Sequence, residues 1–338
     1  MSKKILPKLS YALLMLICAS SSSLPAHAEI TGLTYDINNR GPAPIPPSEK
    51  GLQTVTAETW LGLQGKGIML EGAIFDAKGN LLFCDVTNRK IMRLSPSRKL
   101  STVVTLNDLR PGGIALDKDG KLLIAAIDMQ TKRGAIFSSD LVTHRLHTII
   151  APELGYIPND IAVDAQGGFY FSDFRGTSTA AQGGVYYVSP STHSIKTVLS
   201  GLSQANGIAL SHDGKTLWVT EFGRNLLHRI ILQGATQIDP IGSSIPYHFI
   251  GAAPDSMRMD KDGNVYVAMY GQGRVLVFNP NGIPIGQILL PERQSGKNLY
   301  STSLALNPHK NEIFIVSSDG PEGRAASILR TKSFSAGL

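Results

Sequence analysis

The amino-acid sequence predicts an all-β protein, a six-bladed β-propeller with four-stranded blades. The first observation is a short pattern, an apolar run that ends in a polar turn, which occurs six times. Its copies are EGAIFDAKG from Glu71, GGIALDKDG from Gly112, NDIAVDAQG from Asn159, NGIALSHDG from Asn206, DSMRMDKDG from Asp255 and TSLALNPHK from Thr302. Successive copies start 41, 47, 47, 49 and 47 residues apart, and a repeat of this period is typical of a closed, radially repeated array. The second observation is that no long helical periodicity separates the copies.

Each copy begins the same series of four strands. In the first copy the apolar run of residues 73–75 is followed by the turn DAKGN and by three further strand patterns, LLFCD, KIMRL and STVVTL. The third copy repeats this order with FYFSD, GVYYV and KTVLS. Glycine and aspartate at the turns, with β-branched and aromatic residues between them, predict short antiparallel strands joined by tight turns.

The two ends of the repeat array predict how the ring closes. The copy that starts at Thr302 contains only three clear strand patterns. The segment LQTVTAETWLGL, from Leu52, has the alternation of a strand but precedes the first copy and has no blade of its own. We therefore expect a strand near residues 54–61 to complete the last blade, which would remove an exposed sheet edge.

The chain is expected to contain three regions. Residues 1–28 have a basic start, an apolar run and the tripeptide Ala26-His27-Ala28, as a secretory signal with its cleavage site does. Because the apolar run is too short to span a membrane, we expect an exported protein, periplasmic or secreted, that makes no membrane contact after cleavage. Residues 29–51, rich in proline, are predicted to form an extended leader with no core of its own, and residues 52–338 the propeller.

Charge and motifs exclude several classes of function. The chain has 32 lysine and arginine against 26 aspartate and glutamate residues, and removal of residues 1–28 leaves a net charge of +3. No basic run remains, so a nucleic-acid partner is not expected. Cys84 is then the only cysteine, which rules out an intrachain disulfide, and its apolar strand indicates a buried thiol. Without G-x-S-x-G, P-loop or G-x-G-x-x-G motifs, serine-hydrolase and nucleotide chemistry have no support.

Four residues with side-chain oxygens occupy one position of the repeat: Glu71, Asn159, Asn206 and Asp255. In a propeller the innermost strand of every blade runs beside the central axis, so these residues should meet around that axis. Two carboxylates brought together resist joint ionisation, and a divalent cation resolves that conflict. An all-oxygen set without histidine or cysteine favours Ca²⁺, or less often Mg²⁺, over Zn²⁺.

The alternative interpretation is that these side chains only cap the inner strands by hydrogen bonding to neighbouring backbone. For any one of them alone, that role is the more common one. Gly112 and Thr302 occupy the same position in the other two copies, however, so the fold does not require an acid or an amide there. The coincidence of four such residues therefore favours a metal site.

Several segments resemble one protein family. LEG at Leu70, PND at Pro158, ANGIAL at Ala205 and PDSM at Pro254 are similar to motifs of the gluconolactonase and regucalcin (senescence marker protein) family of calcium-dependent six-bladed propellers. Within that family the likeness is greatest to the staphylococcal drug-responsive lactonases, in TAETWLGL, GGFYFSDFRG, GGVYYVSP, VYVAMYGQGRVLVF and GIPIGQILLP. The resemblance extends over about residues 52–331.

The resemblance implies a calcium-dependent hydrolase that opens the ring of a small-molecule lactone, with the metal polarising the carbonyl group. It implies that one catalytic Ca²⁺ is bound by Glu71, Asn159, Asn206 and Asp255, with Ser256 as a further contact. It also implies that Asp255 is the proton donor, or acid/base, of the reaction.

The sequence departs from the staphylococcal lactonases at two places. Those proteins have aspartate where this chain has Asn159, which is instead similar to regucalcin and to the squid fluorophosphatase. They also carry a second, structural calcium in the loops that correspond to residues 128–137 and 150–156. Lys132, Arg133 and Pro152 fall in these loops here and weaken the expectation of a second ion.

Three questions stay open at the level of sequence. Asp255 could serve as a base toward water or attack the substrate directly as a nucleophile. The same four residues would suit a phosphotriester hydrolase, or a non-catalytic ligand-binding propeller whose calcium is purely structural. The physiological substrate and the oligomeric state are not indicated by any pattern in the chain.

Overall fold

The computed structural model describes residues 32–34 and 40–338 of the chain. The chain divides into two compact units, residues 1–36 and 37–338, and the described strands all belong to the second. The secretory signal predicted for residues 1–28 lies outside the described residues, as do positions 29–31 and 35–39 of the predicted leader. The helices of the described part are single 3-10 turns, and none of them is long and apolar enough to cross a membrane.

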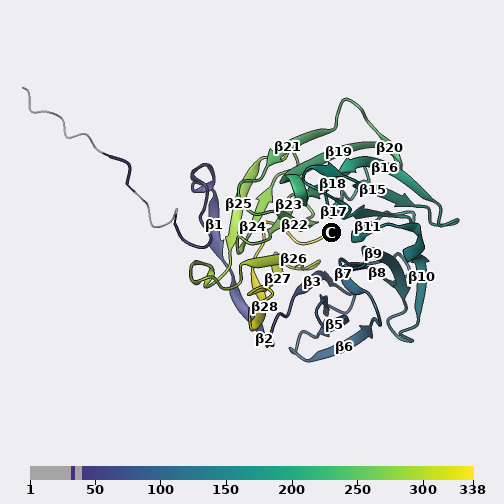
Figure 1. The fold of residues 1–338 in the computed structure, drawn as a ribbon, viewed down its shortest axis with the longest axis horizontal. Coiled ribbons are helices and arrows are strands. Elements are labelled where there is room, and N and C mark those ends of the chain that lie inside the picture. Colours follow the sequence, from purple (N-terminus) through teal and green to yellow (C-terminus); the bar gives the residue numbers. More distant parts are fainter. Residues whose placement is uncertain (1–31, 35–39) are drawn as a thin grey trace, which may run out of the picture. The chain divides into compact units, whose positions relative to one another are not determined.

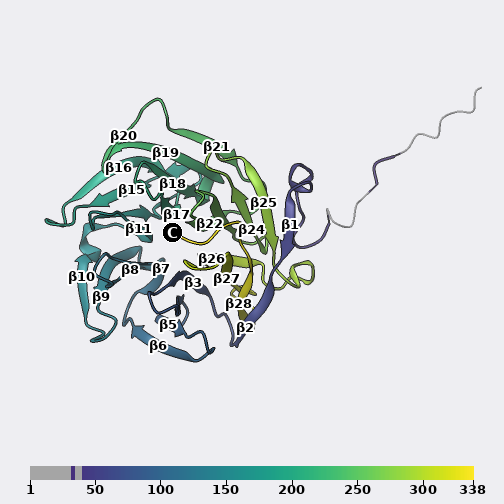
Figure 2. The ribbon, with the colours of Figure 1, turned by 180° about the vertical axis from the view of Figure 1, so that it is seen from behind.

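Six β-sheets, the blades, form a ring, which Figures 1 and 2 show from its two faces. Blade 1 consists of β3 (Leu70–Phe75), β4 (Leu81–Asp85), β5 (Lys90–Leu94) and β6 (Leu100–Thr105). Blade 2 consists of β7 (Arg110–Leu116), β8 (Leu122–Asp128), β9 (Arg133–Ser139) and β10 (Leu146–Ile150). Blade 3 consists of β11 (Pro158–Val163), β12 (Phe169–Asp173), β15 (Gly183–Val188) and β16 (Ile195–Leu202).

The second half of the ring has the same plan with small additions. Blade 4 consists of β17 (Ala205–Leu210), β18 (Thr216–Glu221) and β19 (Leu226–Gly234), with β20 (Gln237–Ile238) and β21 (Ser244–His248) both paired to β19. Blade 5 consists of β22 (Pro254–Met259), β23 (Val265–Met269), β24 (Arg274–Phe278) and β25 (Pro284–Leu289). Blade 6 begins with β26 (Tyr300–Leu306), β27 (Glu312–Ser318) and β28 (Ala325–Lys332). The short pair β13 (Gly176–Thr177) and β14 (Ala180–Ala181) forms a separate two-stranded sheet in the connection between β12 and β15. The 3-10 turns of the described residues are η2 (Pro47–Glu49), η3 (Pro152–Leu154), η4 (Phe222–Arg224) and η5 (Arg293–Ser295).

The first strand of each blade lies at the centre of the ring. Figure 1 shows β3, β7, β11, β17, β22 and β26 around the axis, with the later strands of each blade farther out. The strands of each repeat pair antiparallel in sequence order from this inner strand outward. The six-bladed β-propeller predicted from the sequence repeat is thereby confirmed.

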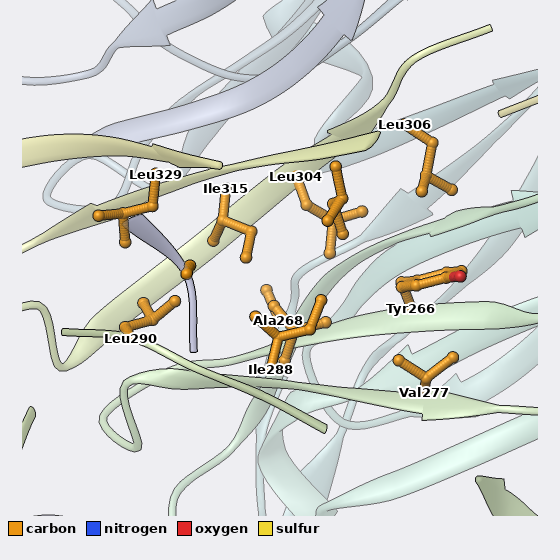
Figure 3. Packing of buried hydrophobic residues seen from close by; sticks show 12 residues of the cluster. Tyr266, Ala268, Val277, Ile288, Leu290, Leu304, Leu306, Ile315 and Leu329 are labelled. Atoms are coloured by element: carbon orange, nitrogen blue, oxygen red, sulfur yellow. The ribbon is translucent and has the colours of Figure 1, made fainter. Parts of the chain in front are cut away.

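The hydrophobic core lies between neighbouring blades. Figure 3 shows Tyr266, Val277 and Ile288 of blade 5 packed with Leu304, Ile315 and Leu329 of blade 6. Because both faces of a blade are covered by its neighbours, every residue of β23 and of β24 is buried. This explains why the second strands of the repeats are continuous apolar runs rather than alternating ones.

The N-terminal strand closes the ring, as predicted. β2 (Glu58–Gln64) pairs antiparallel with β28 and becomes the fourth strand of blade 6. The segment expected to be one strand is, however, two. β1 (Gln53–Thr56) pairs in parallel with β25 of blade 5, and the chain passes from one blade to the next at the buried Ala57. The first and last thirds of the sequence are thus joined at two adjacent sheet edges.

The residues just before β1 are anchored to blade 5 by a buried ion pair. Glu49, in η2, is 1% exposed, and its Oε2 lies 2.5 Å from Nη1 of the fully buried Arg274. The Tyr247 hydroxyl donates a hydrogen bond to Glu49 Oε1 at 2.6 Å. The end of the predicted leader therefore packs on the propeller.

Candidate metal centre

A β-bulge near the start of each inner strand creates the position that the six copies share. In the four blades that carry predicted ligands, three steps along the inner strand oppose two along the second strand, so one residue is extra. A bulge bends the strand and redirects its side chains out of the regular alternation. The predicted ligands occupy these bulges, between Glu71 and Ile74 in blade 1, Pro158 and Ile161 in blade 3, Ala205 and Ile208 in blade 4, and Pro254 and Met257 in blade 5.

The inner strands of adjacent blades approach each other closely at the bulges. A Cβ atom on Gly72, whose φ is +54°, would lie 2.2 Å from the carbonyl oxygen of Gly112 in blade 2. A Cβ atom on Gly207 would lie 2.5 Å from the carbonyl oxygen of Asp255 in blade 5. Only glycine fits at these two contacts, which explains why it follows Glu71 and Asn206 in the repeat.

Glu71 and Asp255 interact electrostatically in the channel. Burial raises the pKa of Glu71 to about 8, and the charge of Asp160 adds to this effect. Burial also raises the pKa of Asp255 well above its usual range, and here the charge of Glu71 adds to the effect. A hydrogen bond from the Asn206 side chain lowers the pKa of Asp255 in part. The structure therefore brings these three predicted ligands together, as the sequence repeat requires.

Two buried oxygen atoms at this place have no hydrogen-bond partner among the described residues, Asn206 Oδ1 and Ser256 Oγ. Leaving a buried acceptor unpaired costs about 1–3 kcal/mol, so such atoms usually have a ligand or ion as partner. Two carboxylates with an amide and a hydroxyl oxygen are the donor types that Ca²⁺ prefers. The residues present therefore fit the predicted ion. No group of three or more His, Cys, Asp or Glu side chains suited to a metal occurs in the described part of the chain.

The fourth predicted ligand, Asn159, belongs to blade 3. It lies in the bulge of β11 and is partly buried. Its carbonyl oxygen would lie 3.3 Å from a Cβ atom on Gly112. The neighbouring Asp160 acts electrostatically on both Glu71 and Asp255. Asn159 is thus held at the same level of the channel as the other ligands.

Hydroxyl groups of the second strands tie each bulge to the next blade. Ser172 of blade 3 accepts a hydrogen bond from the Asp160 amide at 3.0 Å and donates one to the Asn206 carbonyl oxygen of blade 4. Thr220 of blade 4 accepts from the Gly207 amide at 2.7 Å and donates to the Asp255 carbonyl oxygen at 2.8 Å. The backbones of two predicted ligands are therefore fixed by residues outside their own blades.

Asp160 and Arg258 are two charged residues near the centre that the sequence analysis missed. Asp160 is fully buried, and its Oδ2 accepts a hydrogen bond from Arg258 Nη1 at 2.9 Å. A signal for Asp160 was present in the repeat, because the same position is Gly72, Gly207 or Ser256 in other copies. An acid in place of a small residue at a crowded contact indicates a specific partner. Arg258 carries a similar signal, because the same position is isoleucine or alanine in the other five copies, although its partner lies 98 residues away.

Four aromatic rings form an arc on the same side of the ring as the predicted ligands. Phe174, Phe222, Tyr270 and Tyr300 come from blades 3 to 6, and the ring centroids of successive members are 5.5, 5.7 and 4.8 Å apart. All four are partly exposed. Burial raises the pKa of Tyr270 to about 12, and the charges of Asp255 and Glu71 contribute to this effect. Tyr270 therefore connects the aromatic arc to the acidic residues.

A cavity of about 510 Å³ lies at the other end of the inner strands. It is lined mainly by apolar side chains, including Ile114, Ile161 and Ile208, with Leu338 from the C-terminal end of the chain. That end of the chain lies near the axis in Figures 1 and 2. None of the five predicted metal ligands lines this cavity, whereas Arg258 does. The cavity is thus separate from the predicted centre.

Two other predicted features have a clear outcome. Cys84 is fully buried, which confirms the expected buried thiol, and burial together with the charge of Glu71 raises its pKa. In the loops considered for a second calcium, an Arg133 nitrogen lies 3.9 Å from a Glu153 oxygen, and both side chains are exposed. The arginine places a positive charge beside the acid, which disfavours a second cation there.

Comparisons with known proteins agree with this architecture. The family model described as "SMP-30/Gluconolactonase/LRE-like region" matches residues 69–318. A protein of Staphylococcus saprophyticus named Lactonase drp35 is 44% identical over 314 residues, which cover 91% of this chain and 97% of the relative. The protein of the same name from Staphylococcus haemolyticus is 46% identical over 293 residues, which cover 85% of this chain and 89% of the relative.

Solved structures show the same fold at low sequence identity. A calcium-binding protein, regucalcin, from Agrobacterium tumefaciens superposes with a TM-score of 0.67 at 18% identity, over 85% of this chain and 98% of its own. A gluconolactonase from Xanthomonas campestris superposes with a TM-score of 0.64 at 18% identity, over 82% of this chain and 96% of its own. The family model and the staphylococcal relatives confirm the resemblance found in the sequence: the chain belongs to the SMP-30/gluconolactonase/LRE-like family.

Proposed function

We propose that this protein is a calcium-dependent hydrolase that opens lactone rings. The observation that carries the proposal is the meeting of two acids, the partly buried Glu71 and the buried Asp255, beside the unpartnered Asn206 Oδ1 at the centre of the ring. Two acids that resist joint ionisation next to an unsatisfied oxygen favour a divalent cation. Relatives named lactonase match more than four fifths of the chain, which favours a lactone as the substrate.

Five residues would hold the ion: Glu71, Asn159, Asn206 and Asp255, with Ser256 as a further contact. When bound, Ca²⁺ would act as a Lewis acid that polarises the lactone carbonyl group. The chain contributes rigidity to this arrangement, because Thr220 and Ser172 hold the backbone of Asp255 and Asn206 by hydrogen bonds from neighbouring blades.

Asp255 is the residue proposed to move the proton. As water attacks the carbonyl carbon, the Asp255 carboxylate accepts a proton from that water and returns it to the ring oxygen, which leaves as an alcohol when its bond to carbon breaks. In the calcium-free protein burial raises the pKa of Asp255. Bound Ca²⁺ would instead stabilise the Asp255 carboxylate and weaken it as a base, which keeps a second route open. The hydrogen bond from the Asn206 side chain favours the ionised form of Asp255 and so lowers its pKa in part. The same hydrogen bond orients the carboxylate.

Direct attack by Asp255 on the carbonyl carbon is the alternative route to the same products. The two routes differ in where the oxygen from water ends. Under single-turnover conditions in ¹⁸O-labelled water, the acid/base route puts label only in the hydroxy-acid product. Label in the Asp255 carboxylate, read by peptide mass spectrometry, would establish the covalent route instead.

The aromatic arc supports a substrate with an apolar or aromatic face. Phe174, Phe222 and Tyr270 offer three partly exposed rings in contact with one another beside the acidic residues. Flat apolar molecules pack favourably on such rings, whereas a polyhydroxylated ring would lose hydrogen bonds to water there. An aryl lactone is therefore the first substrate to test.

The deciding experiment is a panel of aryl and aliphatic lactones, assayed with calcium and with a chelator. We expect lactone turnover that is lost in chelator and restored by calcium. Asp255→Asn should abolish turnover, and Glu71→Gln should weaken calcium binding, whereas Asp213→Asn, in an exposed turn, should change neither. Full activity in chelator would refute the calcium requirement.

The same panel separates the other two functions that the residues allow. A phosphotriester included as a substrate should be turned over more slowly than the best lactone, and the reverse order would favour a phosphotriester hydrolase. Calcium binding without turnover of any compound would favour a ligand-binding propeller.

We also propose that the protein is exported, because residues 1–28 carry the features of a secretory signal. A mature N-terminus at Glu29, found by mass spectrometry of the extracytoplasmic fraction, would test this.

A further inference from the structure

A buried ion pair crosses the channel just below the predicted ligands. Arg258 Nη1 of blade 5 donates a hydrogen bond to Asp160 Oδ2 of blade 3 at 2.9 Å, and these two blades are not neighbours in the ring. Asp160 is fully buried, and the Arg258 side chain is only 17% exposed. The pair therefore links the inner strands of two blades that are separated by blade 4.

Each member of the pair is built into a strand that carries a predicted ligand. Asp160 directly follows Asn159 in the bulge of β11, its amide donates to Ser172, and its Oδ1 accepts from the Ile161 amide at 2.9 Å. Arg258 follows Asp255 by three residues on β22 and also donates to the Met257 carbonyl oxygen at 2.7 Å. A displacement of either side chain would shift the backbone of a ligand residue.

The charges at this level of the channel have a specific sum. Glu71, Asp160 and Asp255 supply three carboxylates, and Arg258 supplies one guanidinium group. With all four ionised, the net charge is minus two, the charge that one divalent cation neutralises. Without Arg258 there would be one excess negative charge, and without Asp160 the arginine would repel the ion.

We propose that Asp160 and Arg258 are positioning residues that set the charge of the channel to match one divalent cation and hold the Asn159 bulge toward it. The proposal rests on the calcium site of the proposed function. It accounts for an ion pair in a place where apolar packing would be more favourable, because buried ion pairs add little net stability.

The test is calcium affinity, measured by titration calorimetry on the full chain, for both single variants and the double variant. Asp160→Asn should weaken calcium binding by roughly tenfold or more, because the uncompensated arginine repels the ion. Arg258→Met should bind calcium as tightly as the unchanged protein or more tightly, since it adds net negative charge. The double variant D160N/R258M restores the net charge of minus two and should return to within roughly threefold of the unchanged protein.

The controls separate charge from structure. Arg258→Lys keeps the charge and should keep the affinity, which preserves the test if Arg258→Met does not fold. Arg330→Met breaks an exposed ion pair with Glu58 far from the channel and should leave the affinity unchanged.

If both single variants weaken binding and the double variant is weaker still, the pair has only a structural role and the proposal is wrong. If the unchanged protein binds calcium and Asp160→Asn has the same affinity, this proposal alone fails. If the unchanged protein binds no calcium, the proposed calcium site fails as well.

Discussion

Thr220 Oγ1 donates a hydrogen bond to the carbonyl oxygen of Asp255 at 2.8 Å, from one blade to the inner strand of the next. The same hydroxyl accepts a hydrogen bond from the Gly207 amide at 2.7 Å. A side chain of the second strand of blade 4 thus fixes the position of the proposed catalytic acid in blade 5. The catalytic geometry depends on how the blades contact each other as well as on the inner strands.

Thr220→Val should therefore affect both stability and catalysis. Valine has the shape of threonine but leaves the Gly207 amide and one Asp255 lone pair without their buried partner, which should cost about 1–3 kcal/mol of unfolding free energy. We also expect a lower kcat, because Asp255 is no longer held in place. Thr216→Val, at the outer end of the same strand, is the control and should change the unfolding free energy by less than about 0.5 kcal/mol. Equal effects of the two variants would contradict this role of Thr220.

Stability of the calcium-free protein should fall as the pH rises toward 8. The folded protein holds a proton on Glu71 up to a pKa of about 8, whereas the unfolded chain releases it near the ordinary value of 4.5. Between these values the folded state binds more protons, so its stability decreases with rising pH. Bound calcium removes this cost by displacing the proton. The rise in melting temperature on adding calcium should thus be larger at about pH 8 than at about pH 5.

Glu71→Gln is the control for this pH dependence. Glutamine does not titrate, so the fall in stability of the calcium-free protein between the two pH values should become smaller. A calcium-induced shift in melting temperature that is equal at both pH values in the unchanged protein would contradict the raised pKa.

The Glu49–Arg274 ion pair should make a large contribution to the attachment of the N-terminal segment. Both side chains are buried, and Glu49→Gln would leave the Arg274 charge without its acidic partner. Removing one member of a buried pair costs about 3–5 kcal/mol, so the urea midpoint should fall markedly. Glu58→Gln breaks the exposed pair with Arg330 and should cost no more than about 1 kcal/mol. A Glu49→Gln variant as stable as Glu58→Gln would show that the segment is held by its strand pairing alone.

Closure of the ring predicts the effect of a deletion. Removing residues 52–62 takes away β1 and most of β2, which exposes the edges of β25 and β28. We expect a sharply lower melting temperature and a broader transition in differential scanning calorimetry. A chain without residues 29–39 keeps η2 and both strands and serves as the control. An unchanged melting temperature after the first deletion would refute this closure.

Tyr270 should govern substrate affinity through its ring. Tyr270→Ala removes the member of the aromatic arc that contacts both Phe222 and Tyr300. The KM for an aryl lactone should rise by roughly tenfold, whereas Tyr270→Phe should leave it nearly unchanged. An aliphatic lactone provides the second control, because its KM should respond much less. Equal rises for both lactones in Tyr270→Ala would argue against stacking.

The sequence repeat was sufficient to predict the fold and the order of strands. Its period, its turn residues and the unpaired strand at Leu52 all follow from local chemistry that recurs along the chain. The split of that strand at Ala57 was not predictable, because β1 and β2 have similar local patterns and differ only in the blade edge each one meets.

By itself, the sequence determined the propeller and its register, because periodic hydrophobic patterns and glycine positions act through near neighbours in the chain. Only the tertiary structure decided which charges meet. Arg258 reaches Asp160 across 98 residues, Glu49 reaches Arg274, and Thr220 holds the backbone of Asp255. In none of these contacts does a local pattern identify the partner residue. Which side chains become electrostatic or hydrogen-bond partners depends on their distance in space. The sequence repeat specifies where the strands lie relative to one another, but it does not specify which side chains of different blades come into contact.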